Sequence, residues 1–218
     1  MTALKPDPLE ADAASATSSS PVAQATPQPG RYEIDSSTSA VTFRTRHLFG
    51  LAPVRGSFAI RAGMIDVAEP VTDSSIRAEI DTVSVRTGNR QRDRAVRSAR
   101  LLEAGQYPVI TFRSDLVDGP ALRGMLTVRH VTRPVTLSIG QLAVASGSFT
   151  ARATMRIDRT EFGVTAYRGL AGRYLDMTVE VRCVRTCAGQ RITACAPVPR
   201  RDRPPRPRRG RPPRPRSS

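Results

Sequence analysis

Aromatic residues are scarce in this sequence of 218 residues: they make up 5% of it, and tryptophan is absent. Hydrophobic residues nevertheless account for 39%, which is enough to form a core. That core is therefore expected to consist mainly of valine, isoleucine, leucine and alanine. The length allows one domain of ordinary size with extensions, or at most two small domains.

Cysteine and histidine are also few. The sequence has three cysteines, Cys183, Cys187 and Cys195, and an odd number argues against a closed disulfide framework. Their spacing has no paired C-x2-C knuckles and no nearby histidine, which argues against a zinc site. The two histidines, His47 and His130, belong to no nucleophile–histidine–acid order and to no metal-binding spacing, and the sequence has no phosphate-binding loop. We therefore expect no catalytic residues, no metal and no cofactor, and predict that the protein is not an enzyme.

Long apolar runs are missing as well. No segment reaches the ~18–20 consecutive apolar residues that a membrane-spanning helix needs. The N-terminal segment contains proline and acidic residues and lacks the apolar run of a signal peptide. These features predict a cytoplasmic location.

Basic charge is abundant and unevenly distributed. Lys5 is the only lysine among 34 basic residues, and the formal net charge is +15. Residues 1–30 carry a net −2, residues 31–185 a net +8 and residues 186–218 a net +9. We predict a disordered leader over 1–30, a folded domain over 31–185 and a disordered, Pro/Arg-rich tail over 186–218. The tail either binds nucleic acid or anionic membrane non-specifically, or is an inert extension, or is translated beyond the natural end of the gene.

Residues 31–185 alternate between apolar and polar positions, the pattern of half-buried β-strands. Leu175, Met177 and Val179, for example, alternate with polar residues. Turn residues such as those at 118–120 and 146–148 join neighbouring segments closely, which makes consecutive strands antiparallel. The pattern predicts an all-β domain with strands near 40–46, 54–67, 73–83, 108–117, 121–129, 134–143, 148–158 and 173–183. Closure into a barrel would remove the exposed edges, and a two-layer sandwich has the same pattern.

One stretch, residues 88–105, lacks this alternation and is rich in helix-forming residues. We predict a short helix here, with Asn89 as its N-cap and Asp93 in or near the first turn, and expect it to cover one end of a barrel. Asn89, Arg92 and Asp93 have a second interpretation, in which they order an entry loop or hold a polar headgroup.

An ordered set of short motifs runs through the domain and resembles the YceI-like family. The motifs occur at 32–35 (Tyr-Glu-Ile-Asp), 39–43 (Ser-Ala-Val-Thr-Phe), 46–48 (Arg-His-Leu), 54–58 (Val-Arg-Gly-Ser-Phe), 87–89 (Thr-Gly-Asn), 92–93, 97–98, 107–112 (Tyr-Pro-Val-Ile-Thr-Phe), 126–128, 131–137 and 157–164. The resemblance implies an eight-stranded antiparallel lipocalin-like β-barrel with a short helix. It also implies a carrier or sequestering protein that binds an isoprenoid lipid, of the isoprenoid quinone or prenyl phosphate class, inside the barrel.

Candidate ligand contacts follow from this resemblance and from the residue types. Aromatic rings either contact an apolar ligand or fill the core, and the polar candidates either meet a headgroup or cap strand and helix ends. Arg46 and Arg55 either meet a phosphate or are exposed arginines of a strand. The predicted ligand-binding residues are Phe43, His47, Phe58, Asn89, Arg92, Phe112, Phe149 and Phe162.

The chain departs from the family pattern at three places. Ala95 stands where the family has histidine, residues 100–103 (Arg-Leu-Leu-Glu) stand where Asp-Phe-Phe-Asp is usual, and His130 replaces a common glycine. The first two departures concern headgroup contacts. The expected partner is an isoprenoid or other long-chain lipid; a polyanion adaptor acting through residues 186–218 is the alternative function, and pairing into a homodimer is left open.

Overall fold

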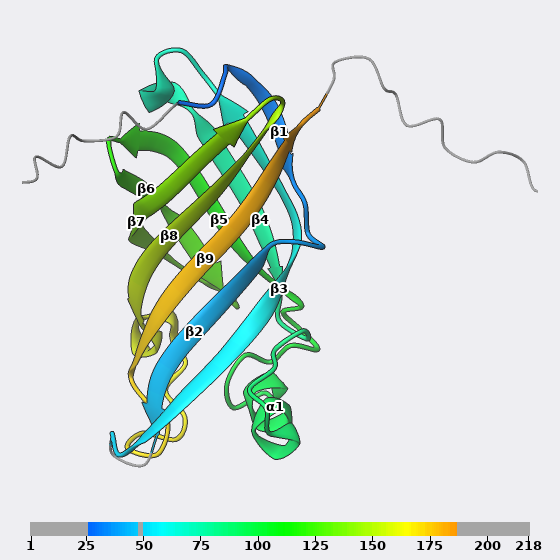
Figure 1. Cartoon of the computed structure of the whole chain (residues 1–218). Helices are drawn as coiled ribbons and strands as arrows, with labels where there is room; N and C mark the ends of the chain where they lie inside the picture. The colour runs from blue at the N-terminus through cyan, green and yellow to red at the C-terminus, as the bar shows by residue number, and fades with distance from the viewer. Residues whose placement is uncertain (1–25, 48–49, 187–218) are drawn as a thin grey trace, which may run out of the picture. The chain divides into compact units, whose positions relative to one another are not determined.

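A computed structural model describes residues 26–47 and 50–186. Within them, one antiparallel sheet contains nine strands, with one α-helix and two short 3-10 helices between strands (Figure 1). The elements are β1 (Gly30–Ile34), β2 (Ala40–His47), β3 (Ala52–Val67), η1 (Val71–Asp73), β4 (Ser75–Asp81), α1 (Arg90–Arg97), β5 (Val109–Asp118), β6 (Ala121–Val128), β7 (Val131–Ala145), β8 (Ser148–Asp158), η2 (Arg159–Phe162) and β9 (Tyr174–Arg185).

The sheet closes into a barrel of eight strand positions. Each strand from β2 to β9 pairs with the next one along the chain, and β9 pairs back with β2. The eight-stranded antiparallel barrel predicted from the sequence is thereby confirmed, and the sandwich alternative is wrong because a sandwich has no such closing pair.

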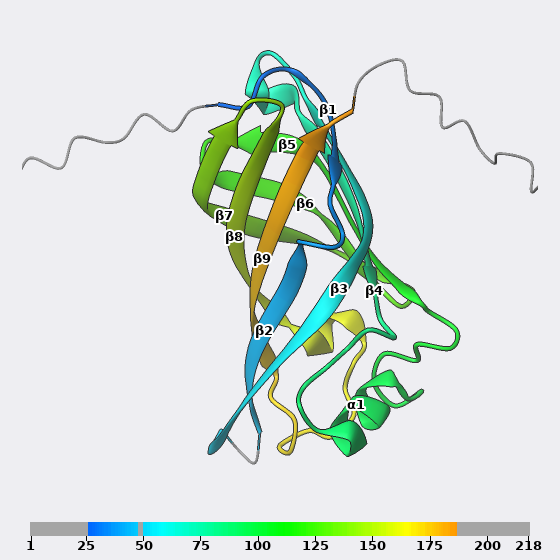
Figure 2. The same cartoon turned by 45° about the vertical axis from the view of Figure 1, so that its right-hand side comes forward.

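The short strand β1 was missed by the sequence prediction. It occupies the same position as β2, further along the barrel: β1 pairs with residues 64–67 of β3, whereas β2 pairs with residues 52–59 of that strand. Both also pair with β9, at its two ends (Figure 2). Five residues give too few alternations to separate such a strand from a loop.

The two ends of the barrel differ. One end, which we call the mouth, carries α1, the turn between β6 and β7, and segment 159–173 between β8 and β9 (Figure 1). The opposite end, which we call the far end, carries η1 and the tight turns that follow β5 and β7. No helix among the residues described here has the length and apolarity needed to span a membrane.

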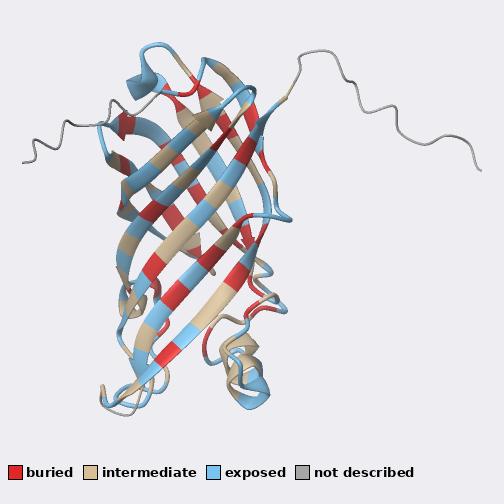
Figure 3. Cartoon of the chain, in the orientation of Figure 1, coloured by how far each residue is buried: buried red, intermediate tan, exposed pale blue. Residues whose placement is uncertain are grey.

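Alternation along the strands sorts the side chains between lumen and solvent (Figure 3). Val41 and Leu126 point inward and are 1% and 2% exposed. Several inward-facing residues of β8 and β9, such as Ala151, Val179 and Val181, are only half-buried because they face a cavity instead of other side chains. Arginines and threonines occupy the alternate, outward positions.

Two glycines let aromatic rings lie flat against the barrel wall. A Cβ atom at Gly56 would collide with the Phe43 ring, and one at Gly124 would collide with the Phe112 ring. The rings therefore cover backbone that has no side chain of its own, which is a common way to stabilise glycine within a strand.

The inward register predicts opposite effects for two neighbouring residues of β6. Leu126→Ala should lower the free energy of unfolding by about 2–5 kcal/mol, because Leu126 is buried. Met125→Ala, a substitution of similar size at a 45% exposed position, should change it by less than about 0.5 kcal/mol. Chemical denaturation of both variants measures the difference, and equal effects would show that the register assigned to β6 is wrong.

Candidate functional site

An internal cavity of about 750 Å³ extends along the barrel from one end to the other. At the far end it is lined by Pro27 and Val71, and at the mouth by Arg92, Tyr167 and Leu170. Its volume lies within the range of about 300–1,000 Å³ typical of small-molecule sites. The eleven residues of β8, at about 3.3 Å per residue and a tilt of about 40°, correspond to a barrel length of roughly 28 Å.

The wall of the cavity is apolar along its middle, because each strand contributes every second residue and those residues are valine, isoleucine, leucine, alanine, methionine and phenylalanine. Polar residues line the ends: Ser74 at the far end, and at the mouth Thr45, Arg46, His47, Asn89, Gln91, Arg92 and Arg159. A long apolar guest with one polar end matches this distribution.

All eight residues proposed from the sequence as ligand contacts line this cavity. Four phenylalanines belong to the wall, and two of them, Phe43 and Phe58, lie with ring centroids 5.5 Å apart. Phe149 packs edge-on against Tyr32 at 5.0 Å. His47, Asn89, Arg92 and Phe162 lie at the mouth end, and contact of any of the eight with a ligand stays a prediction.

Asn89 begins helix α1 in the way the sequence predicts. Its side-chain oxygen accepts a hydrogen bond from the backbone N–H of Arg92 at 3.0 Å, which is N-cap geometry. Arg92 donates from Nε and Nη2 to the hydroxyl and carbonyl oxygens of Thr87, and Asp93 accepts from the Thr87 hydroxyl at 2.6 Å. These bonds fix the start of α1 against the preceding segment, beside the cavity.

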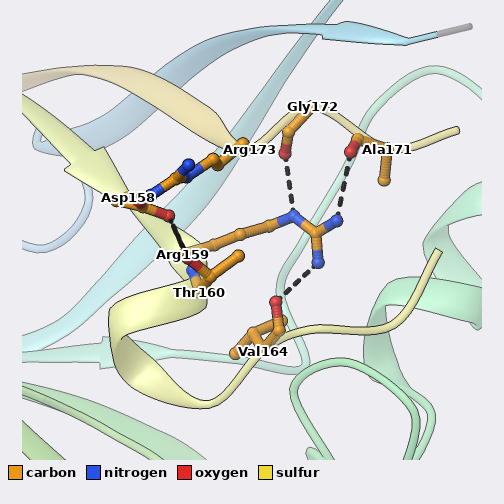
Figure 4. A network of polar contacts seen from close by, with 7 residues as sticks. All are labelled: Asp158, Arg159, Thr160, Val164, Ala171, Gly172 and Arg173. Carbon is orange, nitrogen blue, oxygen red and sulfur yellow. Dashed lines mark hydrogen bonds and ion pairs between the residues drawn. The ribbon is translucent and has the colours of Figure 1, made fainter. Parts of the chain in front are cut away.

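A second arginine organises the opposite side of the mouth. The guanidinium of Arg159 donates to the carbonyl oxygens of Val164, Ala171 and Gly172 at 2.6, 3.1 and 2.8 Å (Figure 4). Segment 163–172 has little regular structure of its own, so these bonds supply partners for carbonyls that would otherwise lack them. The segment is thereby held at the rim of the cavity.

Asp158, next to this arginine, holds the same segment from its other end. Its carboxylate accepts from the backbone and hydroxyl of Thr160, at 2.9 and 2.6 Å, and from Nε of Arg173 at 2.6 Å. Burial raises the pKa of Asp158, but the hydrogen bonds from Thr160 and the ion pair with Arg173 outweigh it, so the pKa lies below the ordinary value of an aspartate.

Sequence reasoning did not single out several cavity residues at the mouth. Arg159 lies in the recognised motif at 157–164, but two of its three carbonyl partners, Ala171 and Gly172, lie outside that motif, 12 and 13 residues further along the chain. Tyr167 and Leu170 lie in a segment without periodicity. The departures from the family pattern also reach the cavity: Ala95, Leu101 and Leu102 all line it. His130 lies instead at the β6–β7 turn, with its ring 5.9 Å from that of Tyr107.

Cys183 is buried within β9, and desolvation raises the pKa of its thiol to about 12. The thiol therefore stays protonated at neutral pH and behaves as a core residue. Cys187, Cys195, most of the proposed leader and almost all of the proposed basic tail lie outside the described residues.

A closed antiparallel barrel with an apolar lumen and polar groups at its ends defines a lipocalin-like binding barrel. Residues 32–184 match the family model described as a YceI-like domain, so the chain belongs to the YceI-like family.

Curated relatives include protein YceI of Escherichia coli O157:H7, 35% identical over 156 residues, and a UPF0312 protein of Yersinia enterocolitica, 33% identical over 156 residues. Each alignment covers 66% of this chain, and 81% and 80% of the two relatives.

Two solved structures share the fold. The chain aligns with a polyisoprenoid-binding domain from Saccharophagus degradans at a TM-score of 0.58 and 14% identity, over 73% of this chain and all (100%) of that one. It aligns with BcnA of Burkholderia cenocepacia at a TM-score of 0.56 and 18% identity, over 68% of this chain and 98% of that one.

The Arg159 bonds predict that Arg159→Ala loosens one side of the mouth. The free energy of unfolding should fall by about 2–3 kcal/mol, because three carbonyls lose a charged donor. Amide hydrogen exchange should accelerate within residues 163–172. Arg168→Ala is the matched control, since Arg168 is exposed on the same segment and makes no side-chain hydrogen bond within the described residues. Equal acceleration in both variants would contradict the anchoring role.

The lowered pKa of Asp158 predicts a specific acid sensitivity. A carboxyl whose folded pKa lies below its unfolded value of about 3.9 contributes full stability above that value, and this contribution is lost as the pH falls through the folded pKa. Asp158→Asn should therefore be less stable than the wild type at neutral pH and lose less stability on acidification.

The control for this measurement is Asp176→Asn, because Asp176 is an exposed carboxylate 3.8 Å from Arg156. Its acid profile should follow that of the wild type in denaturation experiments between neutral and acidic pH. If Asp158→Asn and the wild type lost stability in parallel, the assignment of the acid-sensitive group to Asp158 would be wrong.

Proposed function

We propose that this protein binds one long isoprenoid lipid in the barrel lumen and shields it from water as a carrier or sequestering protein. The observation that carries the proposal is the apolar cavity running through the barrel, with polar residues gathered at its ends. The name of a structural neighbour, a polyisoprenoid-binding domain, supports the same ligand class.

The shape of the cavity favours a chain over a compact ligand. Barrels of eight strands have an interior wide enough for side chains or for one slender molecule. The lumen is narrowed by valine, isoleucine and leucine along its length, and none of the described residues places a charged side chain in its middle. A polar group held there would lose its hydrogen bonds to water without replacement.

The energetics favour a long hydrocarbon chain. Each buried CH₂ contributes about 0.8 kcal/mol to the free energy of binding. The burial of a few isoprene units therefore offsets a substantial part of the entropy lost on binding. The methyl-rich wall matches the methyl branches of an isoprenoid chain. Small residues such as Ala151 and Ala153 in β8 keep the lumen from being filled by the protein's own side chains.

We place the polar end of the lipid at the mouth. Arg46, His47 and Arg92 line the cavity there, and Arg92 uses only two of its five N–H donors on Thr87. A prenyl phosphate would meet two guanidinium groups in this position, and the carbonyl oxygens of an isoprenoid quinone would accept hydrogen bonds from the same donors.

Blocking the lumen tests this proposal. Ala151→Phe places a ring inside the cavity, and Thr150→Phe places the same ring on the solvent side of the same strand. Displacement of a fluorescent polyene fatty acid by polyprenol, polyprenyl phosphate and isoprenoid quinone measures binding. Ala151→Phe should weaken it by about tenfold or more, equivalent to about 1.4 kcal/mol, while Thr150→Phe should leave it unchanged.

Thermal melts of both variants establish that they are folded before binding is compared. If none of the three lipids displaced the polyene fatty acid from the folded wild-type protein, the proposed ligand class would be wrong. Equal weakening by the two phenylalanine substitutions would contradict the proposed location.

A further inference from the structure

The net positive charge of the folded domain is concentrated at the mouth. Segments 44–47, 50–55, 82–108, 129–133 and 156–176 contain 15 arginines and five acidic residues, a net +10. The remainder of residues 31–185 contains eight arginines and ten acidic residues, a net −2. The barrel is therefore strongly polarised, with one cationic end and one nearly neutral end.

Several arginines of the mouth lack a side-chain partner in the part of the chain that the structure describes. Arg90, Arg94 and Arg168 are exposed and make no side-chain hydrogen bond or ion pair among the described residues. A groove on the outer side of the mouth, between the ends of β2 and β3 and segment 168–174, adds further cationic groups against a single acidic residue, Asp176. Its arginines include Arg44, Arg46, Arg55, Arg156, Arg168 and Arg173.

Apolar side chains project from the same end. Leu51, between β2 and β3, is 84% exposed. Leu170 is 43% exposed and lies on the neighbouring segment, next to Ala171, which forms a β-bridge with His47 of β2. Tyr167 is also exposed, and Tyr167 and Leu170 line the opening of the cavity as well. Exposed apolar side chains surrounded by cationic ones are the pattern of surfaces that lie in the interface of an anionic bilayer.

We propose that the mouth of the barrel docks onto the surface of an anionic lipid bilayer, with Leu51, Tyr167 and Leu170 entering the headgroup layer and the surrounding arginines contacting lipid phosphates. The arginine side chains reach phosphate oxygens while their aliphatic stems cover apolar surface. Because Tyr167 and Leu170 also line the cavity at the mouth, docking in this orientation places the mouth of the lumen against the acyl layer. The docking proposal does not depend on the proposed function. The passage of a lipid between bilayer and lumen does rest on the proposed function.

The absence of tryptophan from the chain allows a direct test in the full-length protein. Leu51→Trp places the only tryptophan at the mouth, and Met125→Trp places it on the outer wall of β6 at a 45% exposed position. Vesicles of phosphatidylcholine with phosphatidylglycerol, or of phosphatidylcholine alone, contain no isoprenoid. The emission maximum of the tryptophan, and the quenching of its fluorescence by lipids with brominated acyl chains, then report whether each tryptophan enters the bilayer.

The expected result is a blue shift and bromine quenching for Leu51→Trp on anionic vesicles, and neither change for Met125→Trp. The basic residues 186–218 can bring the protein to such vesicles by charge alone, but this does not place position 51 among acyl chains. If Leu51→Trp stays unquenched while the protein co-sediments with anionic vesicles, the docking proposal is wrong.

Charge reversal provides the second arm. In the Leu51→Trp background, the double substitution Arg94→Glu with Arg168→Glu should weaken vesicle binding by about tenfold or more, measured as the lipid concentration needed for half-maximal quenching. The reason is that two cationic contacts become repulsive. Arg77→Glu with Arg113→Glu is the matched control, since these exposed residues face each other across β4 and β5 away from the mouth and alter net charge equally. Equal weakening by both pairs would show that net charge, and not the mouth, governs binding. Displacement of the polyene probe, measured without vesicles, distinguishes this failure from a failure of lipid binding in the lumen.

Discussion

Pairing between β9 and β2 closes the sheet, and this closure makes the inward side chains of all strands face one shared axis. An open sheet could relieve poor packing by covering its apolar face with a helix, whereas a closed barrel must fill its interior from its own residues or leave a cavity. With Ala151, Ala153 and Val179 on the inner face and no tryptophan, the interior is not filled. The cavity is therefore a consequence of small side chains in a closed sheet.

The mouth stays open because its covering elements are attached to the wall at their own side. Arg92 ties the start of α1 to Thr87, and Arg97 donates to the carbonyl oxygen of Val85 at 2.8 Å, so the helix is fixed to the segment that precedes it. Arg159 and Asp158 hold segment 159–173 from the end of β8. Each element borders the opening without a hydrogen bond across the lumen among the described residues, which leaves an entrance lined by cationic and apolar side chains.

Most of the fold could be predicted from the sequence because a period of two persists through long strands such as β8, where Phe149 to Ile157 alternate with polar residues. The helix start was predictable because the cap of Asn89 is a local interaction. Strand β1 was missed because it is short and its position is set by pairing with distant residues: Arg31 pairs with Asp66, 35 positions away, and Tyr32 pairs with Arg185 at the other end of the domain.

The candidate site was less accessible to sequence reasoning. Alternation identifies which residues share a face but gives no measure of the volume between them, so the aromatic candidates could not be separated into wall and core from the pattern. Arg159 could be recognised as part of a motif, but its role depends on the path of the chain between Gly163 and Gly172. The polarisation of charge toward one end likewise appears only once the topology brings five separate segments together.

The central claim is that the lumen of this YceI-like barrel holds one extended lipid chain. A crystal structure of the protein equilibrated with a long polyprenol tests it most directly. The account predicts continuous ligand density along the barrel axis, in contact with Ala151 and Val179, with the polar end near Arg92 at the mouth. A lumen closed by rearranged side chains, or polyprenol found only on the outer surface, would contradict it.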